Sequence, residues 1–294
     1  MAEKGAVSIS SGDLTARIAP LGAELVSLTD AEGRELMSDG DPAFWTGRAP
    51  ILFPIVGRLN RDEYRLGDRS YSLPQHGFAR RSDFTVVAQD PDAVRFRLVD
   101  SPETRSVYPF AFVLDMAFHL DGPRLTMIAT IGNPGSAPMP ASFGFHPAFA
   151  WPLPYGGARE DHRIVFEKDE PAELRAIVPS GVIADTARPS PVEDNVLALG
   201  DNLFTNDALI WDKLESRALR YGASEGPQLE IAFPDTEWLG IWTKPGTGFV
   251  CIEPWAGMAD PEGFDGDFSE KPGVFIVAPG ESRSFRMIVT LKEN

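Results

Sequence analysis

Cysteine is almost absent from this chain, since Cys251 is the only one among 294 residues. A single thiol excludes an intramolecular disulfide framework, which small secreted domains commonly use for stability. The first twelve residues also lack the apolar segment of a secretory signal. We therefore expect a cytoplasmic protein that works in a reducing compartment.

Positive charge is scarce as well. The chain has 27 Lys and Arg against 43 Asp and Glu, a formal net charge of −16. Without a basic cluster a nucleic-acid partner is not expected, because neutralising phosphates supplies most of that affinity. The one long uncharged segment, Thr126 to Ala158, is interrupted by prolines and glycines that a membrane-spanning helix would not tolerate well. We expect no membrane partner.

Long helical patterns are missing, because no stretch beyond about a dozen residues keeps a 3.6-residue apolar period. Short β-rich runs separated by Gly and Pro take their place, which predicts an all-β sandwich or barrel with few short helices. The even spacing predicts a single domain over residues 1–294, with a long loop at Glu170–Leu203. The expected strands are Ala6–Ser10, Thr15–Ala19, Tyr64–Leu66, Ser70–Leu73, Phe84–Ala88, Val94–Leu98, Phe110–Leu120, Arg124–Ile131, His162–Phe166, Gln228–Phe233, Gly240–Thr243, Phe249–Glu253, Gly273–Val277 and Ser282–Leu291.

Several sequence motifs of common enzymes are absent: G-x-S-x-G, G-x-x-x-x-G-K-[ST], and G-x-G-x-x-G after a strand. Cys251 has apolar neighbours that raise a thiol pKa, so a thiolate nucleophile is not expected. No close pair such as H-x-H or H-x-x-x-H points to a metal. We expect no metal site.

The run F-V-C-I-E-P-W-A-G, Phe249 to Gly257, places a carboxylate in an apolar strand. Burying an unpaired carboxylate costs several kcal/mol or raises its pKa. Strand alternation puts Trp255 on the same face as Glu253. A carboxylate beside an aromatic platform suits sugar recognition. The alternative is a core glutamate paired with an arginine, or a strand end that has reached solvent.

The run S-F-G-F-H-P-A-F, Ser142 to Phe149, places His146 on a face of small residues, opposite a face of phenylalanines. That arrangement leaves space for a ligand beside the imidazole, although it also fits a structural histidine. In N-D-A-L-I-W, Asp207 precedes an apolar strand, where an aspartate usually caps a turn.

Gly67-Asp68 is a two-residue hairpin signal of type II′. If Leu66 pairs with Arg69, Arg58 falls opposite Gly77, and His76 falls opposite Leu59. The turn therefore predicts that a guanidinium and an imidazole lie close together at one end of this hairpin. The alternative for an arginine is a surface ion pair.

In this order, five runs resemble the aldose 1-epimerase, or galactose mutarotase-like, family. They are I-L-F-P-I-V-G-R, L-P-Q-H-G-F-A-R, F-G-F-H-P-A-F, L-G-I-W-T-K-P and C-I-E-P-W-A-G, and the similarity covers nearly the whole chain. The second and last runs are more similar to a bacterial branch. The resemblance implies a large antiparallel β-sandwich with the sugar site on a concave sheet face.

The resemblance also implies residue roles. Glu253 would be the general base and His146 the general acid of a mutarotase. Arg58, His76 and Asp207 would bind the sugar. The tryptophans of two of these runs, Trp242 and Trp255, would contact the substrate. In galactose mutarotases a polar residue lies near Leu239–Trp242, where this chain has Gly240.

The function expected is anomer interconversion of a hexose by acid–base ring opening, in a monomer or homodimer, with no cofactor. One alternative is a hexose-6-phosphate 1-epimerase, in which Arg58, Arg80 or Arg81 would hold the phosphate. The other is a sugar-binding or sensing protein without turnover.

Overall fold

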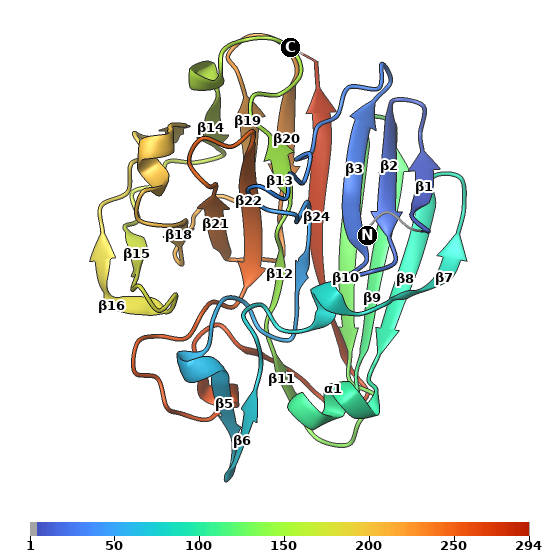
Figure 1. Cartoon of the computed structure of the whole chain (residues 1–294), viewed down its shortest axis with the longest axis vertical. Helices are drawn as coiled ribbons and strands as arrows, with labels where there is room; N and C mark the ends of the chain where they lie inside the picture. Colours follow the sequence, from blue (N-terminus) through green and yellow to red (C-terminus); the bar gives the residue numbers. More distant parts are fainter. Residues whose placement is uncertain (1–4, 294) are drawn as a thin grey trace.

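The larger of the two main sheets of the computed structural model, which describes residues 5–293, has nine antiparallel strands (Figure 1). The order is β17-β14-β19-β20-β24-β10-β9-β8-β7. The strands are β7 Thr85–Gln89, β8 Ala93–Val99, β9 Val113–Asp121, β10 Arg124–Gly132, β14 Arg163–Phe166, β17 Val196–Ala198, β19 Ala218–Gly222, β20 Gln228–Ala232 and β24 Ser282–Lys292.

The second main sheet has eight strands in the order β16-β15-β18-β21-β22-β12-β4, with β13 paired to β22 off this path. Its strands are shorter, apart from β22. They are β4 Ile51–Leu52, β12 Phe143–Phe145, β13 Ala148–Ala150, β15 Leu174–Ile177, β16 Ile183–Arg188, β18 Leu209–Trp211, β21 Trp238–Trp242 and β22 Phe249–Ala256.

Three small sheets complete the fold: β1-β2-β3, β5-β6 and β11-β23. Their strands are β1 Val7–Ser10, β2 Leu14–Ala19, β3 Glu24–Asp30, β5 Glu63–Leu66, β6 Arg69–Ser72, β11 Met139–Ala141 and β23 Phe275–Val277. The helical elements are α1 Pro102–Val107 and the short 3₁₀ turns η1 Asn60–Asp62, η2 Ala79–Arg81, η3 Arg159–Asp161, η4 Asp201–Phe204 and η5 Phe268–Glu270. The prediction of an all-β fold with few short helices is confirmed.

The main core lies where the inner faces of the two large sheets meet. Phe143 of β12 stacks on Phe285 of β24 with ring centroids 5.5 Å apart. Val250 and Ile252 of β22 are fully buried in the same core. Burial of such side chains contributes about 1.5–3 kcal/mol each to the stability of the fold. These contacts hold the eight-stranded sheet against the nine-stranded sheet.

Most expected strands form within a few residues of the predicted bounds, but the long loop predicted at Glu170–Leu203 was wrong. That segment contains β15, β16 and β17. β16 is the edge strand of its sheet, and Asp185, Thr186 and Ala187 on it are exposed. Because an edge strand is only partly covered, its sequence lacks the sustained alternation that marks the other strands. The single-domain assignment stays a prediction.

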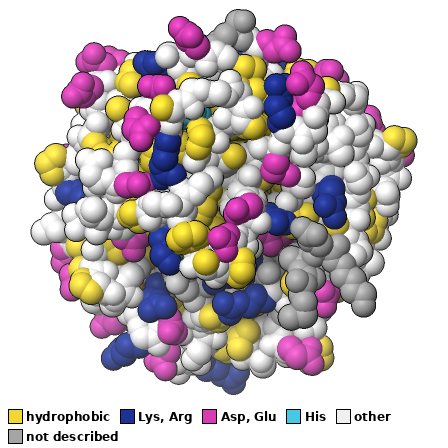
Figure 2. Space-filling model, turned by 45° about the horizontal axis from the view of Figure 1, so that its top comes forward, with side chains coloured by type: hydrophobic (Ala, Val, Ile, Leu, Met, Phe, Trp, Pro, Cys, Tyr) yellow, Lys and Arg dark blue, Asp and Glu magenta, His cyan; other side chains and the backbone are white. Residues whose placement is uncertain are grey.

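The surface is mixed in charge. Figure 2 shows acidic and basic side chains interspersed on one face, alongside single hydrophobic side chains. Among residues 5–293, no helix is long and apolar enough to cross a membrane.

Candidate active site

Strand β22 has two different faces. Val250 and Ile252 point into the main core, whereas Cys251 and Glu253 are buried on the opposite side. The predicted alternation is therefore confirmed, and it puts the carboxylate on the side away from the main core. Only 2% of the Glu253 surface is exposed to solvent.

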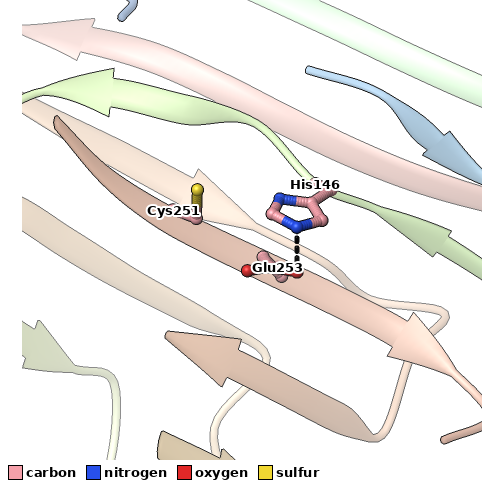
Figure 3. A group of neighbouring side chains, drawn as sticks. All are labelled: His146, Cys251 and Glu253. Atoms are coloured by element: carbon pink, nitrogen blue, oxygen red, sulfur yellow. Dashed lines mark ion pairs between the residues drawn. The ribbon is translucent and has the colours of Figure 1, made fainter. Parts of the chain in front are cut away.

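The strand register brings His146 to Glu253. Gly144 pairs with Trp255 and Ala148 pairs with Cys251 on the same strand, so His146, midway between, falls opposite Glu253. Directly opposed residues have Cβ atoms about 4.5–5.5 Å apart. His146 Nε2 accordingly lies 3.3 Å from Glu253 Oε2 (Figure 3). The carboxylate is paired with an imidazole and not with an arginine.

Trp255 forms an aromatic floor because glycines flank it on both sides. A Cβ on Gly144 of β12 would stand 2.5 Å from Trp255 Cδ1, and one on Gly240 of β21 would stand 2.5 Å from Cη2. The indole therefore extends across both neighbouring strands close to their backbones. Gly240 has no side chain, which gives the indole its space.

A pocket of about 310 Å³ opens over this sheet face. Its walls come from strands of the eight-stranded sheet and from loops beside it. The lining residues are Trp45, Gly57, Gln75, His76, Arg80, His146, Ile177, Gly181, Ile183, Asp207, Ala208, Ile210, Trp242, Glu253, Trp255 and Ala259. Six of the seven residues predicted for the site thus line one hollow. Arg58 is not among them.

His76 is held in one tautomer. The Gly57 amide donates to His76 Nδ1 at 3.1 Å, and the His76 amide donates to the Gly57 carbonyl at 2.9 Å. Neutral His76 must therefore carry its proton on Nε2. Burial lowers the pKa of His76, and His146, Arg80 and Arg58 lower it further. The ring lies edge-on to His146, with centroids 5.7 Å apart.

The predicted hairpin forms in the predicted register, with Leu66 opposite Arg69. The register changes beyond it: His76 bonds to Gly57, and Gly77 pairs with Phe53 instead of Arg58. The Arg58 side chain is 44% exposed, and its Nε lies 3.8 Å from Asp62 Oδ1. Its sugar-binding role stays a prediction.

Asp207 and Trp242 stand at the pocket wall. Asp207 is exposed, has a φ of 69° and accepts a hydrogen bond from the Ala208 amide at 2.7 Å. It therefore serves as the predicted turn residue while its carboxylate remains at the pocket. Trp242 meets the His146 ring edge-on, with centroids 6.2 Å apart.

Trp45 is a pocket residue that the sequence did not single out, and Arg80 is one that it named only as a candidate phosphate-binding residue. Trp45 stacks on the His146 ring, with centroids 5.0 Å apart. It lies in the irregular segment before β4, where no periodicity indicates a facing side. Arg80 Nη2 donates to the Gln75 carbonyl at 2.9 Å, while its buried Nε has no partner among residues 5–293. Its position in L-P-Q-H-G-F-A-R, four residues after His76, was the available signal.

Burial shifts the two central groups in opposite directions. It raises the pKa of Glu253 well above its ordinary value, with a further rise from the negative charge of Asp207. The nearby Trp255 side chain opposes that rise, although its Nε1 makes no regular hydrogen bond within the described chain. Burial and Arg80 lower the pKa of His146 to about 3. Glu253 and His146 together therefore hold one proton over a wide pH range.

The family model described as aldose 1-epimerase matches residues 5–290. This chain belongs to the aldose 1-epimerase family. Its family and structural relatives support a sugar epimerase or mutarotase function.

Relatives of this aldose 1-epimerase family member share both its sequence and its fold. The chromosomal LacX protein of Lactococcus lactis is 31% identical over 283 residues, covering 93% of this chain and 95% of its own. A galactose mutarotase related enzyme from Lactobacillus acidophilus has a TM-score of 0.90 at 32% identity, covering 98% of this chain and 97% of its own. A galactose mutarotase-like protein from Lactobacillus casei has a TM-score of 0.92 at 31% identity, covering 98% and 100%. The predicted family and sandwich fold are confirmed.

Proposed function

We propose that the chain is a mutarotase that interconverts the α and β anomers of a hexose. The observation that carries the proposal is the His146–Glu253 contact of 3.3 Å beside an aromatic floor. The pocket volume, about 310 Å³, lies at the small end of ligand sites and suits a monosaccharide. The apolar face of a pyranose would lie on Trp255, with its hydroxyls toward the polar wall.

The reaction needs one acid and one base close together. The anomeric oxygen and the ring oxygen are bonded to the same carbon, C1, so two groups in mutual contact reach both. When the single proton of the pair lies on His146, Glu253 accepts the proton of the anomeric hydroxyl and His146 donates its proton to the ring oxygen. The C1–O5 bond breaks and a carbonyl forms at C1. Each such transfer typically contributes about 10²–10⁴-fold to a rate.

The second half reverses these transfers. After ring opening, Glu253 carries a proton and His146 is neutral, which is the protonation state that burial of both groups favours. Rotation about C1–C2 presents the other carbonyl face. His146 then removes the proton from the C5 hydroxyl, Glu253 returns its proton to the carbonyl oxygen, and the ring closes as the opposite anomer. His76, which lines the pocket and carries its proton on Nε2 when neutral, would hold a sugar oxygen.

A hexose 6-phosphate is the second candidate substrate, and Arg80 favours it. Arg80 lines the pocket and has a buried Nε without a partner in the described chain, so it could donate to an anionic group. Gln75 accepts the only hydrogen bond that the guanidinium makes within the described chain. The net charge of −16 opposes dianions over long distances, but a half-buried guanidinium acts locally.

Anomer equilibration tests the proposal. Freshly dissolved α-glucose, α-galactose and their 6-phosphates are followed by polarimetry or NMR, with the uncatalysed rate subtracted. Acceleration of the free sugars is the expected result. Acceleration of the phosphates alone would assign the second candidate. Binding of sugars without acceleration would contradict both and leave a binding protein.

A further inference from the structure

We propose that His146, Cys251 and Glu253 form a binding site for a thiophilic divalent cation such as Zn²⁺, which would inhibit the enzyme. One ligand atom from each residue lies within 4.8 Å of the other two, and all three residues are buried. The three side chains share one sheet face, with Cys251 and Glu253 on β22 and His146 across from them (Figure 3).

The donor set fits zinc. Thiolate sulfur, imidazole nitrogen and carboxylate oxygen bind Zn²⁺ at about 2.0–2.3 Å, and three protein donors leave a fourth tetrahedral position open. With those bond lengths, neighbouring donors stand about 3.3–3.7 Å apart, so a separation of up to 4.8 Å has to close by about 1 Å. His146 Nε2 and Glu253 Oε2, at 3.3 Å, are already at the required separation.

A second observation points to the same place. His146 Nδ1 is buried and has no hydrogen-bond partner anywhere in residues 5–293. Because Nδ1 is unengaged, coordination of a cation by His146 breaks no protein hydrogen bond at that nitrogen. The pocket is lined by His146 and Glu253, which gives a cation a route to two of the three donors, and Cys251 is fully buried beside them.

Charge neutrality favours the bound state. Zinc binding releases two protons to solvent, one from the Cys251 thiol and one from the His146–Glu253 pair, because the metal binds the thiolate, the carboxylate and the neutral imidazole. A dication with one thiolate and one carboxylate has no net charge, so it avoids the cost of burying an isolated ion. The bound cation would occupy the lone pairs that the acid and base need, and anomer interconversion would stop.

The test uses the full chain without a histidine tag. Co²⁺ replaces Zn²⁺ for absorption spectroscopy, because a cobalt–thiolate bond gives a charge-transfer band in the near ultraviolet. Cys251 is the only thiol in the sequence, so any such band reports this residue. We expect the band in the wild type and its loss in Cys251→Ala, with Cys251→Ser as a second variant that preserves side-chain size.

Inhibition by Zn²⁺ is measured in parallel. Cys251→Ala should keep basal anomer interconversion and weaken Zn²⁺ inhibition by at least about 100-fold, since even outer-shell changes cost 10–100-fold in metal affinity. His119→Ala is the matched control, because His119 is an exposed histidine 3.9 Å from Asp92 and represents surface metal binding. Absence of the cobalt band, or equal inhibition of Cys251→Ala and wild type, would overturn the proposal. The absorption result holds whichever sugar is the substrate.

Discussion

The two large sheets differ in regularity. In the nine-stranded sheet, β9 and β10 are nine residues each and pair along their whole length. In the eight-stranded sheet, β12, β13 and β18 have only three residues each, and the chain leaves its ladder at His146. The nine-stranded sheet, called here the regular sheet, contributes apolar core. The eight-stranded sheet, called here the broken sheet, places a carboxylate, an imidazole and a tryptophan on one face.

The comparison shows how a strand can accept a buried charge. Glu253 stays in a long, fully buried strand because the break opposite it supplies an imidazole in register. Glycine at Gly144 and Gly240 then leaves the indole of Trp255 its space. Stability and site chemistry should therefore respond to substitutions in different sheets.

The largest effect is expected in the regular sheet. Phe285→Ala removes a fully buried ring that stacks on Phe143, so it should lower the free energy of unfolding by about 3–5 kcal/mol. The folded fraction should keep its kcat/KM, because Phe285 does not line the pocket. Chemical denaturation and anomer kinetics measure the two quantities. A loss of kcat/KM beyond the unfolded fraction would show that the sheets do not divide these roles.

The next effect belongs to the broken sheet. Glu253→Gln should lower kcat at least about 100-fold, equivalent to about 2.7 kcal/mol, because an amide cannot accept the anomeric proton. Glutamine is nearly isosteric, so circular dichroism and denaturation should show an intact fold. Turnover near that of the wild type would remove Glu253 from the mechanism.

A glycine pair compares the sheets directly. Gly240→Ala would place Cβ 2.5 Å from Trp255, so the indole must move, KM should rise, and overpacking should cost about 1–3 kcal/mol of stability. Gly132→Ala on β10 is the control, since its nearest contact there would be 3.8 Å. That control should stay within about 0.5 kcal/mol of the wild type. Equal KM values for both variants would rule out Trp255 as a substrate platform.

The smallest effect concerns pH. Burial lowers the pKa of His146 to about 3 and raises that of Glu253, so the single proton of the pair persists across the neutral range. As pH falls through the ordinary histidine value of about 6.5, kcat/KM should stay nearly constant. Its acid limb should appear only at much lower pH. An acid limb near 6.5, after subtraction of buffer catalysis, would show that His146 titrates as an exposed histidine.

Most residues that the sequence assigned to the site line the pocket, whereas some strands around it were missed, and the roles of those residues stay predictions. Alternation around Glu253 was enough to place Trp255 beside it, since period two is a local property of a strand. The His146 partnership came from family resemblance, because register between strands a hundred residues apart leaves no local signal. The edge strand β16 and its neighbour β15, which supply Ile183 and Ile177 to the pocket, were missed for lack of alternation.

Loop residues were the hardest to predict. Trp45 reaches His146 from an irregular segment, and its position depends on tertiary packing. Arg58 and Arg80 lie on either side of the predicted hairpin. The sequence favoured Arg58 as the sugar-binding arginine because it follows an apolar run. In the structure His76 bonds to Gly57, and Arg80 lines the pocket whereas Arg58 does not.

A double-mutant cycle on anomer interconversion tests most directly whether Glu253 and His146 act as one proton-holding pair. Rates are measured for Glu253→Gln, His146→Asn and the double variant on the same sugar, with folding checked for each. We predict that the double variant is scarcely slower than the slower single variant, because either substitution already disables the pair. Losses that multiply in the double variant would contradict the account, since the two residues would then act independently.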